Sequence, residues 1–91
     1  GVELASGAIW LAPVSIQMNL TSLGIDDDFI NSITLYCMDG SEYVVESEAD
    51  FISNHIYVLI DQEGGIITYT FNQIVDTDSI ASVEINGVMY E

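Results

Sequence analysis

The most concentrated group of side chains that could do chemistry is a run of three carboxylates, Asp26, Asp27 and Asp28. Carboxylate oxygens bind hard cations, and calcium takes six to eight oxygen ligands from several directions. Three neighbouring side chains cannot supply that number alone, and the sequence has no EF-hand spacing. The run is therefore a candidate calcium site that needs further oxygens, and a solvated turn is the alternative.

Two further acidic pairs, Asp61 with Glu63 and Asp76 with Asp78, fall in segments that we expect to be loops. Aspartate side chains in such segments commonly accept hydrogen bonds from their own backbone. We therefore interpret both pairs as turn residues rather than as cation ligands.

His55 is the only histidine and Cys37 the only cysteine. A zinc site needs several nitrogen or sulfur ligands, so none is predicted. Nucleophilic catalysis would need a serine or cysteine beside His55 and an acid to orient the ring, and no motif places such residues together. We predict no catalytic residues, no cofactor other than the calcium considered above, and a buried structural role for Cys37.

Four aromatic residues could form a flat platform for a sugar: Trp10, Tyr36, Tyr57 and Tyr69. Aromatic side chains at alternate positions of strands also pack in cores and against cross-strand neighbours. Both interpretations remain open from the sequence.

The charge balance limits the partners of the chain. Its 91 residues include 15 acidic residues and no lysine or arginine, for a net charge of −15. Binding to nucleic acid or to an anionic membrane surface depends on basic residues, so neither is expected. Hydrophobic residues make up 49% of the chain, which is typical of a folded domain. The expected partner is a protein or the rest of a longer parent chain.

A hairpin over residues 32–46 is the clearest local structure, because apolar and polar residues alternate on both arms. A three-residue loop, Met38-Asp39-Gly40 with Gly40 left-handed, brings the apolar faces together. In that register Leu35 lies opposite Tyr43, and Ile33 lies opposite Val45.

A second hairpin is predicted around Asn86-Gly87, a dipeptide that favours a type I′ turn. This turn places Ile85 opposite Val88 and Val83 opposite Tyr90, on one face. Further strands are predicted over residues 8–12, 14–20, 56–61 and 66–72, with a change of direction at Pro13.

The remaining segments are interpreted as connections. Residues 1–7 form a lead-in, a short edge strand or a processing remnant. Residues 23–31 connect two strands and could include a helical turn that begins with the aspartates. In residues 47–55, Ala49, Phe51 and Ile52 are expected to hold the loop to the core.

This pattern predicts one domain over residues 1–91, an antiparallel, immunoglobulin-like β-sandwich of about seven to eight short strands. A small closed barrel is the alternative. The residues expected to face inward are Val14, Ile16, Ile33, Leu35, Val45, Val58, Ile60, Tyr69, Phe71, Val83 and Ile85.

Three stretches carry a family resemblance: residues 12–16 (APVSI), the turn at 36–41 (YCMDGS) and the ending at 75–88 (VDTDSIASVEINGV). Their order resembles the C-terminal immunoglobulin-like domain of uncharacterised, membrane-anchored, anti-sigma-factor-like proteins of Gram-positive bacteria. The resemblance implies an extracellular or cell-surface domain without known catalytic residues. The first residue, Gly1, also suggests a fragment of a larger protein, whose membrane anchor would lie outside this segment.

Two functions follow as hypotheses. The first is a non-enzymatic extracytoplasmic module for spacing, sensing or protein interaction, with no direct membrane contact of its own. The second is an accessory module that binds calcium or carbohydrate. The sequence leaves the oligomeric state open.

Overall fold

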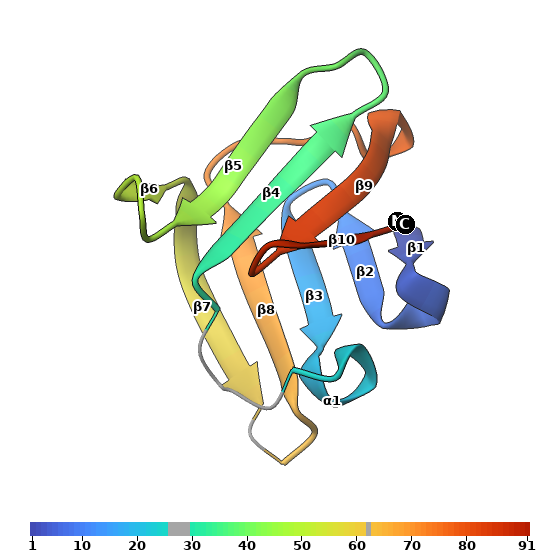
Figure 1. Cartoon of the computed structure of the whole chain (residues 1–91), viewed down its shortest axis with the longest axis vertical. Helices are drawn as coiled ribbons and strands as arrows, with labels where there is room; N and C mark the ends of the chain where they lie inside the picture. The colour runs from blue at the N-terminus through green and yellow to red at the C-terminus, as the bar shows by residue number, and fades with distance from the viewer. Residues whose placement is uncertain (26–29, 62) are drawn as a thin grey trace.

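The computed structural model describes residues 1–25, 30–61 and 63–91, and two antiparallel sheets account for most of them (Figure 1). Sheet A has the strand order β1 (Val2–Leu4), β2 (Ile9–Ala12), β3 (Ser15–Asn19), β8 (Ile66–Phe71) and β7 (His55–Asp61). Sheet B has the order β10 (Val88–Tyr90), β9 (Ile80–Ile85), β4 (Ser32–Cys37), β5 (Glu42–Ser47) and β6 (Ile52–Ser53). The helical pieces are short: η1 (Ala5–Gly7), α1 (Leu20–Leu23) and η2 (Thr77–Ser79).

The predicted all-β, antiparallel class is confirmed, with ten strands in the described residues instead of seven or eight. The difference comes from very short strands such as β6, whose two residues carry no recognisable alternation. An immunoglobulin-like topology in particular stays a prediction.

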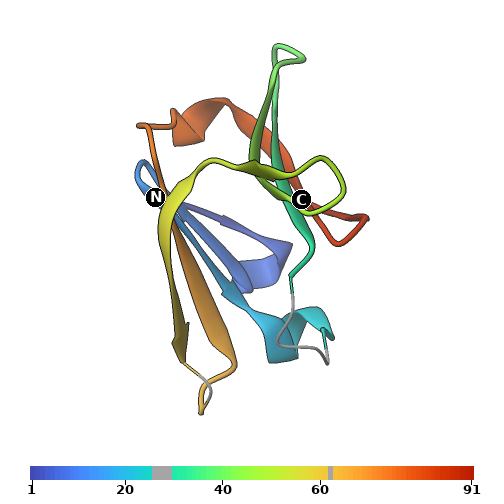
Figure 2. The same cartoon turned by 90° about the vertical axis from the view of Figure 1, so that its left-hand side faces the viewer.

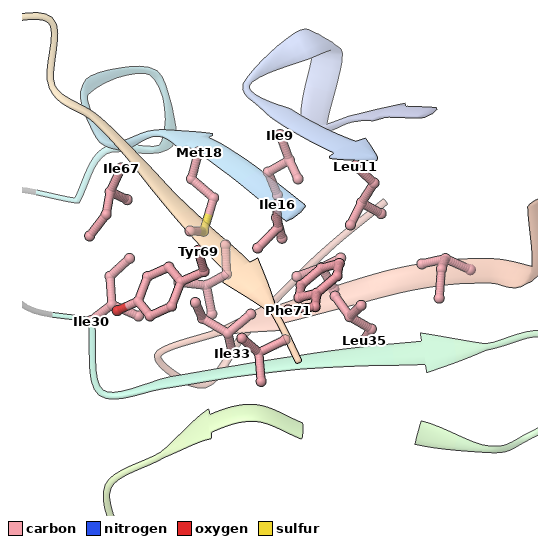
Figure 3. Packing of buried hydrophobic residues seen from close by; sticks show 14 of the residues in the cluster. Ile9, Leu11, Ile16, Met18, Ile30, Ile33, Leu35, Ile67, Tyr69 and Phe71 are labelled. Carbon is pink, nitrogen blue, oxygen red and sulfur yellow. The ribbon is translucent and has the colours of Figure 1, made fainter. Parts of the chain in front are cut away.

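The core lies between the inner faces of the two sheets (Figure 3). Strands β2, β3, β4, β5 and β9 contribute side chains with no measurable exposure, as the two-residue period of a strand requires. These are Ile9, Leu11, Ile16, Met18, Ile33, Leu35, Val45, Val83 and Ile85. Strand β8 adds Ile67, Tyr69 and Phe71 from its inward positions.

The β4–β5 hairpin has the predicted three-residue loop. Gly40 has a φ of 92°, and the Cys37 N–H donates to the Ser41 carbonyl at 2.8 Å. Leu35 lies opposite Tyr43 as expected, but Ile33 pairs with Glu46 and not with Val45. A bulge at this point leaves Val45 as an extra residue whose side chain still enters the core.

The β9–β10 hairpin has the predicted register, with Ile85 opposite Val88 and Val83 opposite Tyr90. Asn86 and Gly87 both have positive φ, 53° and 87°, which is the type I′ geometry. Val88 is nevertheless 51% exposed, because β10 is the edge strand of sheet B.

Two residues predicted to face inward are exposed. Val14 lies in the turn that follows Pro13 and not in β3, and it is 51% exposed. Ile60 is 55% exposed because it lies near the end of the β7–β8 hairpin, which extends past sheet B (Figures 1 and 2). Val58, on the same strand, is only partly buried.

The expectation that residues 47–55 are held to the core by Ala49, Phe51 and Ile52 is wrong. All three are exposed, and Phe51 is 94% exposed with a φ of 57°. The segment forms a turn in which the Phe51 N–H points to the Glu48 carbonyl at 3.4 Å, so its side chains project outward.

The other connections follow the prediction in part. Residues 2–4 form β1, the short edge strand considered for the first residues. The helix α1 ends at Leu23, the first residue of the predicted connection over residues 23–31, and the Asn19 Oδ1 caps it by accepting from the Ser22 N–H at 3.1 Å. Asp26, Asp27 and Asp28 lie outside the described residues.

Candidate functional site

Strand β7 differs from the other three edge strands in its length and in the apolar side chains that it exposes. The edge strands β1, β6 and β10 have three, two and three residues, whereas β7 has seven. On one side β7 pairs with β8, and the sheet order gives it no neighbour on the other side. We call its run from Ile56 to Ile60 the β7 edge.

The β7 edge is apolar and exposed at four of its five positions. Ile56, Tyr57, Leu59 and Ile60 are between 52% and 67% exposed. Tyr57 and Leu59 lie on the outer face of sheet A, opposite Thr70 and Thr68 of β8. Natural proteins protect such edges with lysine, proline, bulges or shortness. Here a bulge next to His55 is the only such feature, so the backbone from Tyr57 to Ile60 is open to another strand.

A polar cluster lies where β7 begins. The Tyr69 hydroxyl donates to Glu46 Oε2 at 2.8 Å, and the His55 ring packs edge-on against Tyr69 with centroids 4.9 Å apart. The His55 Nε2 lies 3.7 Å from Glu46 Oε1 and 3.2 Å from Ser53 Oγ. Burial, followed by the hydrogen bond and the charge of Glu46, raises the pKa of Tyr69 well above its usual range.

This cluster brings a serine, the histidine and an acid together, which the sequence did not reveal. A catalytic triad uses the two ring nitrogens for different partners, one for the nucleophile and one for the acid. Here Ser53 and Glu46 both approach Nε2, and the buried Nδ1 has no hydrogen-bond partner among the described residues. This arrangement is not that of a catalytic triad, and we interpret the cluster as contacts that anchor the start of β7. The absence of enzymatic activity stays a prediction.

Asn54 fixes the position at which the chain passes from sheet B to sheet A. Its backbone N–H donates to the Val45 carbonyl at 2.8 Å, and its Nδ2 donates to the Val44 carbonyl at 2.7 Å. The Tyr43 hydroxyl donates to the Asn54 carbonyl at 2.6 Å. These bonds attach Asn54, the residue just before β7, to residues 43–45 of β5, so the β7 edge starts from a fixed point.

The candidate calcium ligands Asp26, Asp27 and Asp28 are outside the described residues, so the calcium hypothesis stays a prediction. Within residues 1–25, 30–61 and 63–91, no group of three or more histidine, cysteine or acidic side chains is placed to hold a metal ion. Asp61 and Asp76 accept backbone hydrogen bonds from Gly64 and Asp78, both at 3.2 Å, as expected for turn residues.

The prediction for Cys37 needs correction, and the two interpretations of the four aromatic residues can be compared with the structure. Cys37 is only partly buried and packs against the border of the core. The four aromatic residues do not form one platform, because Tyr69 lies in the core and Tyr36 belongs to sheet B. Trp10 and Tyr57 do share the outer face of sheet A.

A shallow hollow of about 250 Å³ lies beside Trp10. Gln17, directly opposite Trp10 on β3, and Asn19 line it together with Gly7, Ala8 and Ile66. No motif marks the two amides in the sequence, although a turn at Pro13 and the strand alternation place Trp10 and Gln17 on one face.

Comparisons with protein-family models, curated proteins and solved structures find no match to this chain. The resemblance to the anti-sigma-factor-like proteins therefore stays a prediction. Among the described residues, no helix has the length and apolar character needed to cross a membrane.

Proposed function

We propose that the chain is a non-enzymatic extracytoplasmic module of a surface-anchored bacterial protein, and that it binds a protein partner at the β7 edge. The observation that carries the proposal is a seven-residue edge strand with exposed apolar side chains, in a fold whose other edges are two or three residues long. An added strand would pair with the open backbone and cover Tyr57 and Leu59. The location outside the cell rests on the family resemblance alone.

Charge defines the chemistry of the partner. The chain has a net charge of −15 and no lysine or arginine, so every lysine or arginine in an ion pair must come from the partner. A second copy would bring 15 more carboxylates and be repelled. The occupant is therefore an extended segment with apolar residues at alternate positions and lysine or arginine at its ends.

A hollow of about 380 Å³ beside β6 would receive such a basic end. Its lining residues include the acidic residues Glu46 and Glu48 and the exposed Phe51. Carboxylates bind guanidinium and ammonium groups, and an aromatic face attracts the same cations. Asn54 alone separates β6 from β7, so one extended segment could reach both features.

The proposal is tested with a synthetic peptide in which valine and threonine alternate, with a pair of lysines at each end. Isothermal titration should show binding that weakens as sodium chloride is added. A peptide of the same core with glutamate at both ends should not bind. Leu59→Thr should weaken binding, and the matched control Val88→Thr, at the edge of the other sheet, should not.

Two results would overturn this proposal. Equal binding of the lysine and glutamate peptides would remove the role of charge. Reversible self-association of the protein alone, lost in Leu59→Thr and measured by sedimentation equilibrium, would show that a second copy occupies the edge instead.

The accessory-module alternative is supported by one observation, the Trp10 hollow with its two amides. This feature favours a carbohydrate over calcium, because it joins an aromatic face with uncharged hydrogen-bonding groups.

A further inference from the structure

We propose that Trp10, Gln17 and Asn19 form a subsite for one ring of a neutral sugar on the outer face of sheet A. The inference goes beyond the protein docking proposed for the β7 edge and does not depend on it. It gives the carbohydrate alternative a defined place and a defined ligand class.

The indole of Trp10 supplies the apolar surface. The side chain is 43% exposed although it belongs to a strand in the interior of sheet A. A Cβ on Gly1 would come within 2.8 Å of Trp10 Cζ2, so the backbone of Gly1 lies close to the ring. Part of the indole surface stays open beside it. The C–H face of a pyranose ring stacks on such a surface.

Two amides lie beside the indole. Gln17 is the cross-strand partner of Trp10, and Asn19 follows two residues later on the same face of β3. The Asn19 Oδ1 accepts the Ser22 N–H at 3.1 Å, a bond that fixes the amide and does not use its Nδ2. An amide group combines a donor with an acceptor, which is the combination that sugar hydroxyls match.

The size of the hollow fits a single ring. Its volume is about 250 Å³, and Gly7 and Ala8 contribute little or no side chain to its lining. Pockets for drug-sized ligands are larger, roughly 300–1,000 Å³. One sugar ring against Trp10, with the rest of an oligosaccharide extending over the sheet, is consistent with these dimensions.

The charge of the chain selects against acidic sugars. Glu3 lies opposite Trp10 on β1, and the whole chain has a net charge of −15. Uronic acids, sulfated sugars and phosphates would be repelled. Neutral oligosaccharides carry no such penalty, so the ligand class is a neutral glycan.

Because Trp10 is the only tryptophan, its fluorescence reports on this hollow directly. The probes are the hexasaccharides of glucose, xylose and N-acetylglucosamine, each β-1,4-linked, with polygalacturonate as the acidic control. At least one neutral hexasaccharide should shield Trp10 from the neutral quencher acrylamide with a dissociation constant below about 10 mM. Polygalacturonate should not shield it.

The affinities of two glutamine variants then show whether the sugar binds beside Gln17. Gln17→Ala should weaken binding by roughly 2- to 12-fold, the loss expected for one hydrogen bond. Gln73→Ala is the matched control, since Gln73 is an exposed glutamine outside the hollow, and it should bind as the parent does. Val88→Thr, on the edge strand β10 of the other sheet, should also leave the affinity unchanged.

Three results would overturn the inference. These are no shielding by any neutral hexasaccharide, equal shielding by polygalacturonate, or equal losses in Gln17→Ala and Gln73→Ala. Peptide binding at the β7 edge would remain possible in each of these cases.

Discussion

Leu35 and Leu59 show how differently this fold treats one residue type. Leu35 on β4 has no exposed surface, whereas Leu59 on β7 is 60% exposed. Leu35 faces the core between the two sheets, whereas Leu59 lies opposite Thr68 on the outer face of sheet A. Their exposure therefore depends on the face of the sheet to which each side chain points.

Truncation should reveal this difference as a difference in stability. Leu35→Ala should lower the free energy of unfolding by roughly 2–5 kcal/mol, because it removes buried methyl groups and leaves a cavity. Leu59→Ala should change it by less than about 1 kcal/mol. Urea denaturation of both variants measures the two values. Equal losses would show that β7 is covered within the isolated chain.

Because of Tyr69, the stability of the fold should depend on pH in the alkaline range. Burial, with Glu46 as the second cause, raises the pKa of Tyr69 in the folded state above the value of about 10 expected in the unfolded chain. A raised folded pKa means that the native state holds the proton more tightly. The resulting stability is complete below pH of about 10 and is lost as the pH rises further.

Tyr69→Phe should therefore make the melting temperature fall less steeply between about pH 10 and pH 11.5. The slope should be reduced and not abolished, because burial also raises the pKa of Tyr43. Tyr57→Phe, at an exposed position, is the control and should keep the parental slope. An unchanged slope in Tyr69→Phe would show that this hydroxyl is not the group that titrates.

At the scale of elements, the β9–β10 turn is attached to the start of β4. The Asn86 Oδ1 accepts the N–H of Asn31 at 2.7 Å and that of Ser32 at 3.3 Å. The Glu84 carboxylate accepts the Ser32 hydroxyl at 2.9 Å and also the Gly87 N–H. The turn thus orders the backbone that enters the central strand of sheet B.

Two substitutions of Asn86 separate its two roles. Asn86→Gly keeps the positive φ and loses the side-chain bonds, so it should lower the free energy of unfolding by about 1–2 kcal/mol. Asn86→Ala should cost about 1 kcal/mol more, because alanine is strained at a φ of 53°. Thermal and urea denaturation of both variants provide the comparison. Equal losses of unfolding free energy in the two variants would mean that the positive φ at residue 86 does not disfavour alanine.

The sequence predicted the turns because their chemistry is local. Gly40 and the Asn86-Gly87 pair are residue types that tolerate positive φ, and the structure has positive φ at all three. The bulge at Val45 carries no such local signal, so the pairing of Ile33 was predicted wrongly.

Burial on β7 was harder to predict than the strand itself. Alternation identified residues 56–61 as a strand, but the edge position of β7 follows from the pairing of β3 with β8, which are far apart in the sequence. For this reason the β7 edge was not foreseen as a candidate site. The Trp10 hollow was partly foreseeable, since Pro13 marked the turn that brings Gln17 beside Trp10.

At the scale of the whole molecule, charge opposes folding. The chain carries 15 acidic residues without lysine or arginine, within a radius of gyration of 11.9 Å. Repulsion among exposed carboxylates is screened by salt. We therefore expect roughly 0.5 M sodium chloride to raise the melting temperature at pH of about 7. A melting temperature that does not respond to salt would show that specific contacts of the carboxylates offset the repulsion.

The central claim is that β7 is the edge on which a partner strand adds. Hydrogen exchange of backbone amides, measured with and without the lysine-flanked peptide, tests it most directly. The β7 amides that point away from β8 should exchange rapidly in the free protein and become protected when the peptide is present, while the edge strands β1 and β10 stay unchanged. Protection that appears at one of those edges, or no protection at β7 under conditions in which the peptide binds, would contradict the claim.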